Sequence, residues 1–152
     1  MIDFKSYRTR AELVEAIKAA PDIPAATSAQ AMKYIRQHLP KESWFQKNIK
    51  KAVLEARPDA FAWKAAAGPY GRAGIPDICA IIGGTFYGFE VKRPFLGEIS
   101  KLQEKTAEAI RKAGGKVYFV SWPEEVHRIL QADAEHEAGR SGGGKSGDDK
   151  NP

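Results

Sequence analysis

The chain has 152 residues, of which 43% are hydrophobic, so one folded domain with an appendage is expected and wholesale disorder is excluded. No run of about eighteen apolar residues could cross a membrane, and the charged start MIDFKSYRTR lacks the apolar segment of a signal peptide. A single cysteine, Cys79, excludes an internal disulfide framework and a cysteine-rich zinc site. We therefore expect a cytoplasmic protein that binds no membrane.

The net charge of +5 is small, but it is unevenly distributed along the chain. Residues 41–116 hold fourteen basic and eight acidic side chains, a net +6, whereas residues 117–138 carry a net −4. Positive charge concentrated in the middle of the chain is what a polyanion-binding surface requires.

Hydrophobic periodicity and turn residues predict a succession of helices and strands. Thr9 with Glu12 forms a capping-box pattern, Thr27 or Ser28 can cap a second helix, and Gly83-Gly84 is placed for a hairpin turn. This order of elements predicts a mixed α/β layer. In chain order we expect helices near 9–20, 27–39 and 41–56, strands at 61–64, 78–82 and 86–92, a helix at 100–113, a strand at 116–121 and a helix at 123–138.

The same segmentation predicts three parts of the chain. Residues 1–40 form a helical N-terminal extension, and residues 41–138 form the α/β domain. Gly139 ends the last helix, and the Gly/Ser-rich tail 139–152 is disordered because its low-complexity composition gives it no core to bury.

Charged residues occur in and beside the predicted hairpin, whose strands are otherwise built of apolar residues suited to burial. Asp77 follows Pro76, and Glu90 and Lys92 lie two apart on the returning strand, so the latter two side chains share one face. The hairpin folds back, so Asp77 can approach Glu90 across the ladder. Two close carboxylates repel unless a cation lies between them, and oxygen ligands suit Mg²⁺. We therefore predict a metal site that polarises a phosphodiester, with Lys92 stabilising transition-state charge.

These motifs resemble the PD-(D/E)xK nuclease superfamily, whose signature is present as Pro76-Asp77 and Glu90-Val91-Lys92. The wider pattern is similar to the virus-type replication-repair nuclease domain, VRR-NUC, over roughly residues 41–122. Its further motifs are Gly74-Ile75-Pro76-Asp77, Phe89-Glu90-Val91-Lys92, Ser100-Lys101-Leu102-Gln103 and Gly114-Gly115-Lys116-Val117.

The resemblance implies a restriction-endonuclease-like α/β fold, in which helices flank a mixed central β-sheet. It also implies Mg²⁺- or Mn²⁺-dependent DNA cleavage. Small stand-alone members of the family act as homodimers on branched DNA such as four-way (Holliday) junctions, so branched DNA and a second copy are the implied partners. A phage or prophage source is also implied, and we expect no small-molecule cofactor.

The resemblance further implies roles for two residues outside the signature. An acid on the first core helix completes the metal site, for which Glu42 is the candidate, and a glutamine after the lysine strand lines the site, which Gln103 matches. Each has another interpretation: Gln103 completes a capping box with Ser100, and Glu42 favours the dipole at its helix N-terminus.

The expected site therefore has two overlapping sets of residues. The metal ligands are Asp77, Glu90, the carbonyl of Val91 and, directly or through water, Glu42. The catalytic residues are Asp77, Glu90, Lys92 and Gln103.

Contacts to DNA are expected from basic and aromatic residues near this site. Lys64, Tyr70 and Arg72 flank the glycine-rich loop 68–74, which lets a nucleic-acid backbone approach closely, although a plain loop fits equally well. Arg93, next to Lys92, is the fourth candidate. The favoured function is a DNA endonuclease. A catalytically silent nucleic-acid-binding module and an RNA nuclease of the same fold are the alternatives.

Overall fold

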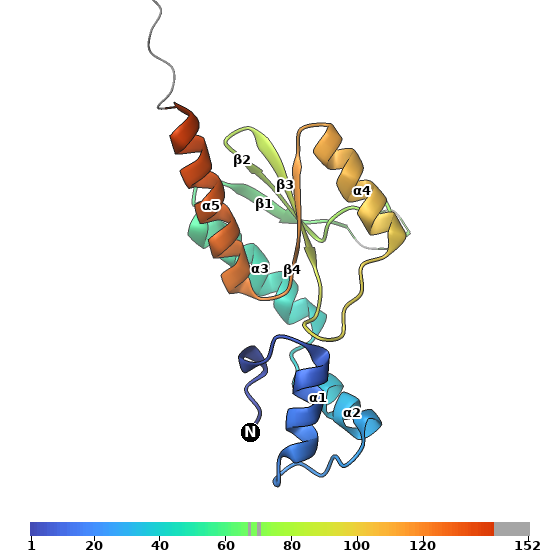
Figure 1. The fold of residues 1–152 in the computed structure, drawn as a ribbon. Coiled ribbons are helices and arrows are strands. Elements are labelled where there is room, and N and C mark those ends of the chain that lie inside the picture. Colours follow the sequence, from blue (N-terminus) through green and yellow to red (C-terminus); the bar gives the residue numbers. More distant parts are fainter. Residues whose placement is uncertain (67, 70, 142–152) are drawn as a thin grey trace, which may run out of the picture.

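The computed structural model describes residues 1–66, 68–69 and 71–141 of the chain (Figure 1). Within these residues, five α-helices and one short 3-10 helix accompany a four-stranded sheet, which confirms the predicted α/β class. No helix of the described part is long and apolar enough to span a bilayer. The elements are η1 (Phe4–Ser6), α1 (Arg10–Ala19), α2 (Ser28–His38), α3 (Glu42–Ala56), β1 (Phe61–Lys64), β2 (Ile78–Ile82), β3 (Thr85–Val91), α4 (Lys101–Lys112), β4 (Lys116–Val120) and α5 (Pro123–Ser141).

The sheet is mixed and has the strand order β1-β2-β3-β4. β1 and β2 pair antiparallel, as do β2 and β3, whereas β4 runs parallel to β3 after the crossover through α4. Gly83 and Gly84 make the predicted hairpin turn, with φ of 56° and 80°. These positive φ values are those of a two-residue type I′ turn, which glycine adopts without steric cost.

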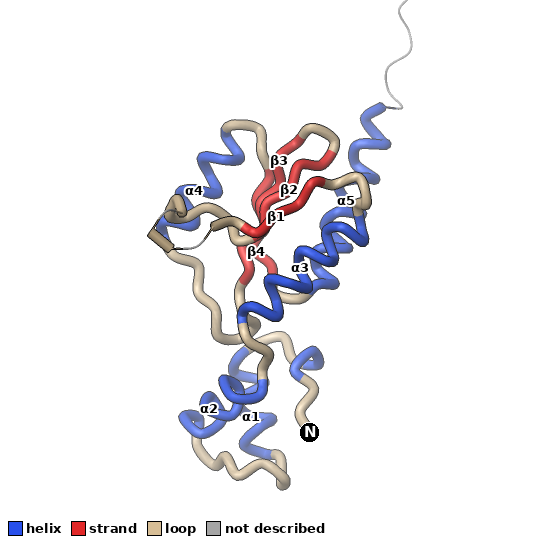
Figure 2. Tube along the Cα trace, turned by 180° about the vertical axis from the view of Figure 1, so that it is seen from behind, coloured by secondary structure: helices blue, strands red, loops and turns tan. Residues whose placement is uncertain are grey.

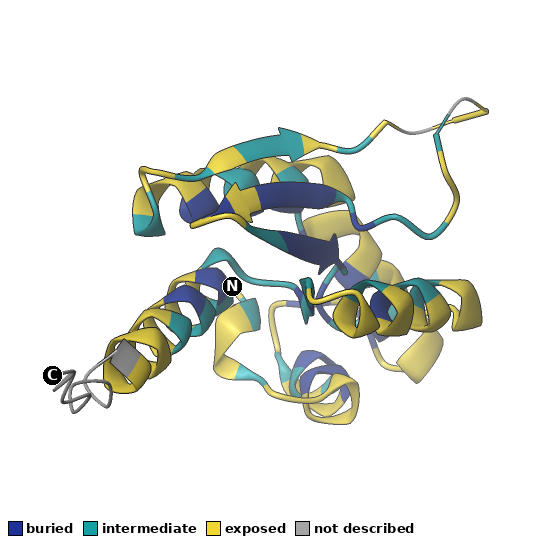
Figure 3. Cartoon of the chain, turned by 90° about the horizontal axis from the view of Figure 1, so that it is seen from above, coloured by how far each residue is buried: buried dark blue, intermediate teal, exposed yellow. Residues whose placement is uncertain are grey.

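Helices cover the two faces of the sheet unequally. α3 and α5 lie side by side on one face, and α4 lies on the other face near β4 (Figures 1 and 2). Tyr87, Phe89 and Val91 alternate along β3 into the core beneath α3 and α5, where the buried residues concentrate (Figure 3). Because side chains alternate along a strand, Glu90 points to the opposite face, toward α4.

The N-terminal extension packs beneath the sheet layer, against the beginnings of α3 and α5 (Figure 1). Its buried side chains Leu13, Ile17 and Ile35 belong to the same hydrophobic cluster as Phe45 of α3. The extension therefore shares a continuous core with the α/β domain.

Local sequence signals explain most of the element boundaries. Thr9, Thr27 and Ser100 each cap a helix through a complete capping box, so Thr27 rather than Ser28 is the second cap. One boundary prediction was wrong: α5 continues through Gly139 to Ser141. Gly139 does not have the positive φ with which a glycine usually terminates a helix, so it remains inside the last turn. The tail 142–152 lies outside the described residues.

Candidate active site

Asp77 is held at the start of β2 by contacts on both sides. Its carbonyl accepts a hydrogen bond of 2.8 Å from Ala65 N, and its carboxylate Oδ2 accepts one of 2.8 Å from the backbone N–H of Val91 on β3. Pro76 is buried against Gly88, where an added Cβ would lie 2.6 Å from Pro76 Cγ. The segment before β2 thus packs against β3, and the Asp77 carboxyl is in contact with that of Glu90, which confirms their predicted proximity.

Glu90 is a charged side chain in an almost closed environment. It is 4% exposed, and its Oε1 accepts a hydrogen bond of 3.0 Å from Gln103 Nε2. Burial raises the pKa of Glu90 well above its ordinary value, the neighbouring Asp77 carboxyl raises it further, and Lys92 opposes the shift. Glu90 therefore retains a proton more readily than an isolated carboxyl group and shares a hydrogen bond with Asp77, and a cation between the two groups could take the place of that proton.

Gln103 connects the acidic and basic halves of the site. Its Oε1 accepts a hydrogen bond of 2.8 Å from Lys92 Nζ, while its Nε2 donates to Glu90. The same Oε1 also accepts from the backbone N–H of Ser100 at 3.0 Å, which completes the capping box of α4. The capping box is therefore present, and the same side chain also contacts the two candidate site residues, while its part in the active site stays a prediction. These hydrogen bonds join the first turn of α4 to the end of β3. Lys92 lies one residue past the end of that strand.

Two adjoining cavities lie over this cluster and share Glu42 as a common wall. The larger has a volume of about 490 Å³, and the smaller of about 240 Å³. Glu42 is exposed at the first residue of α3, and its charge raises the pKa of Glu90. Several predicted residues line these cavities: Lys64, Arg72 and Asp77 line the larger one, and Val91, Lys92 and Arg93 line the smaller one. Glu90 and Gln103 line neither.

The side chains around these cavities offer mainly oxygen ligands for a divalent ion. Within the described ranges, no group of three or more His, Cys, Asp or Glu side chains is arranged to hold a metal. Asp77 and Glu90 form a pair, and Glu42 lines the larger cavity together with Asp77 and acts on Glu90 through its charge. Mg²⁺ typically binds through one or two carboxylates and takes its other ligands from water and substrate phosphates. The residues present fit such an ion.

Arg93 differs from the other predicted DNA contacts. Its Nε donates to the carbonyl of Pro40 at 3.0 Å, and its Nη2 donates to the carbonyls of Leu39 at 3.0 Å and Arg36 at 3.5 Å. The guanidinium thus fastens the C-terminal end of α2 to the segment that follows β3, and a part in DNA binding stays a prediction. Tyr70 lies outside the described residues.

Gln46 and Gly97 also line these cavities, although no site role was predicted for either. Gln46 lines the larger cavity, and its Nε2 donates to Glu42 Oε1 at 3.4 Å. Its position four residues after Glu42 on one helix face was the signal that could have assigned it. Gly97 lines the smaller cavity, where an added Cβ would lie 2.9 Å from Lys92 Cβ. No motif of the sequence marks Gly97, because its importance arises from a fold-back of the chain.

Comparisons with known proteins give one structural likeness. No protein-family model and no curated protein matches the chain. A solved structure described as a "VRR_NUC domain" is similar, with 25% sequence identity and a TM-score of 0.49, over 59% of this chain and 94% of that one. Its description names the family that the sequence motifs resemble.

Proposed function

We propose that the protein is a metal-dependent DNA endonuclease that hydrolyses phosphodiester bonds at the Asp77–Glu90 pair. The observation that carries this proposal is the linked set of Asp77, Glu90, Gln103 and Lys92, in which two adjacent carboxyl groups are joined to a lysine through one glutamine. A structural ion pair would not need two acids at this position. The resemblance of the sequence motifs to PD-(D/E)xK nucleases supports the same function.

The proposed cofactor is Mg²⁺, with Mn²⁺ as a substitute. Asp77 and Glu90 would hold it, with the carbonyl of Val91 and, directly or through water, Glu42. Such an ion supplies Lewis acidity toward the phosphodiester and makes water a better nucleophile at neutral pH. Hard cations prefer oxygen ligands, which is the donor chemistry that these residues offer.

The remaining residues would position the reacting groups. Lys92 Nζ, held at 2.8 Å from Gln103 Oε1, is placed to stabilise the negative charge that develops on the phosphate. Gln103 would keep the Lys92 ammonium and the Glu90 carboxyl in a fixed relative orientation. Lys64 and Arg72, both exposed at the larger cavity, would contact the backbone of the DNA, as would Tyr70 and Arg93.

We further propose branched DNA as the substrate and a homodimer as the active form. A dimer with two-fold symmetry presents two identical sites, which suits paired cuts in a four-way junction. A phage or prophage source is part of the same proposal.

The test is cleavage of a panel of branched and linear DNAs by purified Asp77→Ala protein with Mg²⁺ or Mn²⁺. We expect the rate to fall by about a thousandfold or more, because the chemical step depends on this carboxylate, while DNA binding survives. Calorimetric titration should show Mg²⁺ binding to the wild type and not to the variant. Asp22→Ala is the matched control, since Asp22 is exposed in the extension and pairs with the N-terminal amine.

Each contrary outcome has a distinct meaning. Undiminished cleavage by the Asp77→Ala protein would contradict the proposed site. A wild type that binds DNA but neither binds Mg²⁺ nor cleaves is a silent binding module. Faster cleavage of matched RNA substrates assigns the same chemistry to RNA.

A further inference from the structure

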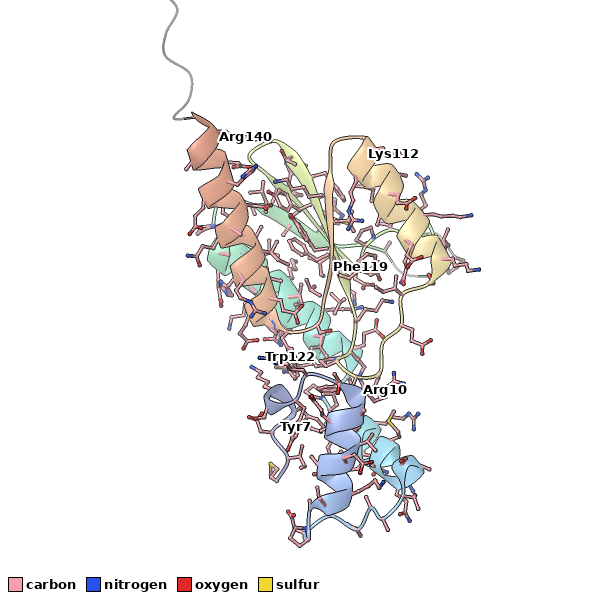
Figure 4. All side chains as sticks on the ribbon, viewed as in Figure 1. Tyr7, Arg10, Lys112, Phe119, Trp122 and Arg140 are labelled. Carbon is pink, nitrogen blue, oxygen red and sulfur yellow. The ribbon has the colours of Figure 1, made fainter. Side chains whose placement is uncertain are left out.

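A third cavity, of about 720 Å³, lies where the N-terminal extension meets the α/β domain. We call it the junction cavity. Its walls come from the segment before α1, from the loop that follows Lys92 and from the start of α5. Tyr7, Arg10 and Trp122 mark it in Figure 4. Gly97 lines both this cavity and the smaller active-site cavity, so the two adjoin.

The charged side chains of the junction cavity are mostly basic. Lys5, Arg8, Arg10 and Arg128 line it, against the single acid Glu125. Glu125 is already engaged, because its carboxylate oxygens accept hydrogen bonds from the backbone N–H groups of Ser121 and Trp122 at 3.3 Å and 3.2 Å. The cavity therefore presents an excess of positive charge.

Two of the four basic side chains already form contacts within the protein. Lys5 Nζ forms an ion pair with Glu124 at 2.6 Å, and Arg10 Nε donates to the carbonyl of Phe95 at 2.6 Å. Arg8 and Arg128 are exposed and, among the described residues, form no side-chain hydrogen bond or ion pair. Each has an acid at longer range: the Arg8 charge contributes to lowering the pKa of Glu12, and that of Arg128 contributes to lowering the pKa of Glu124. These two guanidinium groups are available to a ligand.

The junction cavity is fixed in position relative to the catalytic lysine. The loop after Lys92 turns tightly, with Gly97 N donating to the Arg93 carbonyl at 2.9 Å and Phe95 in the left-handed region at φ 63°. Arg10 holds this loop from α1, and Arg93 holds the end of α2. A ligand in the cavity would thus lie at a constant distance from Lys92.

We propose that the junction cavity binds the sugar–phosphate backbone of the nucleic-acid strand that is being cut, to one side of the scissile phosphate, with Arg8 and Arg128 as phosphate ligands. Guanidinium groups suit this role because their planar donors match phosphate oxygens. The extension is then part of the substrate-binding surface. This inference rests on the proposed function, since it assumes that the Asp77–Glu90 site acts on nucleic acid.

The test measures DNA binding by fluorescence anisotropy in EDTA, over a series of salt concentrations, for wild type and Arg8→Ala/Arg128→Ala. Each lost phosphate contact lowers the slope of log affinity against log salt by about 0.7 to 0.9, so the double variant should lose about 1.5 from the slope. We also expect its affinity to fall about tenfold or more at moderate salt. The matched control, Lys33→Ala/Arg140→Ala, removes the same charge away from the cavity, and Arg140 lies at the far end of α5 (Figure 4).

Equal slopes for the double variant and its control would overturn the proposal. Because all four substituted side chains are exposed, thermal unfolding should show both variants folded. The binding comparison needs no cleavage, so it tests the cavity even if the wild type fails to cut. Conversely, if the wild type cleaves DNA and the double variant binds DNA normally, the cavity is not a binding site and the proposed function still stands. In cleavage, the double variant should raise KM and leave kcat largely unchanged.

Discussion

Gln103 bonds to more of the candidate site than any neighbouring side chain, and it belongs to a helix cap at the same time. Replacing it by alanine removes the bridge between Lys92 and Glu90 as well as the capping contact to Ser100 N. We expect the cleavage rate of Gln103→Ala to fall about 10- to 100-fold, the usual effect of losing a residue that orients metal ligands. Steady-state cleavage assays with Mg²⁺ measure it.

The chain offers a matched control for this substitution. Gln30 occupies the equivalent position in the capping box of α2, where its Oε1 accepts from Thr27 N at 3.1 Å. Gln30→Ala should therefore lose the stability of the capping contact, about 1 kcal/mol, without losing activity. If both variants cleave at the same reduced rate, the glutamine acts only through the cap.

At the residue scale, the sequence predicted that the acidic side chains lie close together, but not the contacts of the residues around them. The proximity of Asp77 to Glu90 could be predicted because a hairpin brings its two strands together. The shared face of Glu90 and Lys92 follows from the alternation of side chains along a strand. The contacts of Arg93 were not readable, since they join it to carbonyls more than fifty residues earlier. Such long-range contacts depend on how α2 docks, which no local pattern specifies.

At the scale of elements, the packing of the segment before β2 against β3 depends on Gly88. The buried Pro76 ring occupies the space where a side chain at position 88 would begin, and the added Cβ would lie 2.6 Å from Pro76 Cγ. We expect Gly88→Ala to destabilise the fold by about 1 to 3 kcal/mol, because a close-packed ring cannot move aside freely. Urea unfolding measures this loss. Cleavage should fall further than stability explains, since Asp77 follows the displaced proline.

Gly139→Ala is the control for this substitution. Gly139 lies inside α5, and a Cβ there meets nothing within 4 Å. Alanine also favours a helix over glycine, so the control should be neutral or stabilised by about 0.5 to 1 kcal/mol. A Gly88→Ala protein as stable and active as this control would show that the segment before β2 can move away from β3 without loss.

The elements themselves were largely predictable, and the exception has a physical cause. Capping boxes at Thr9, Thr27 and Ser100 are local patterns, and each begins a helix as expected. Gly139 was expected to end α5, but a glycine ends a helix only where the chain turns to positive φ. The composition of a segment cannot specify that turn.

At the scale of the whole molecule, one end of the sheet face that bears Glu90 presents apolar side chains to solvent. Phe61 and Ile81 are paired across β1 and β2 and are 70% and 45% exposed. Trp63 stands next to Phe61, with ring centroids 5.8 Å apart. Phe61 and Ile81 lie toward the hairpin turn, at the opposite end of β2 from Asp77, whereas Trp63 pairs with Cys79 nearer to Asp77. Exposed apolar groups gathered in this way are typical of protein contacts.

We predict that this face joins two copies in the proposed homodimer. A two-fold contact places the patch of one copy against the same patch of the other, so one substitution acts twice. Phe61→Glu/Ile81→Glu therefore gathers four carboxylates at the contact and should yield a monomer of 16.7 kDa, whereas the wild type sediments at roughly twice that mass. Sedimentation equilibrium distinguishes the two states.

Leu54→Glu is the control for the dimer contact, because Leu54 is an exposed apolar residue of α3, on the other side of the sheet. This variant should remain dimeric. A wild type that stays monomeric at all accessible concentrations, or a double variant that still dimerises, removes this face from the assembly. If the prediction holds, the monomeric variant should retain cleavage of simple substrates and lose paired cuts in a four-way junction, because each copy carries its own Asp77–Glu90 pair.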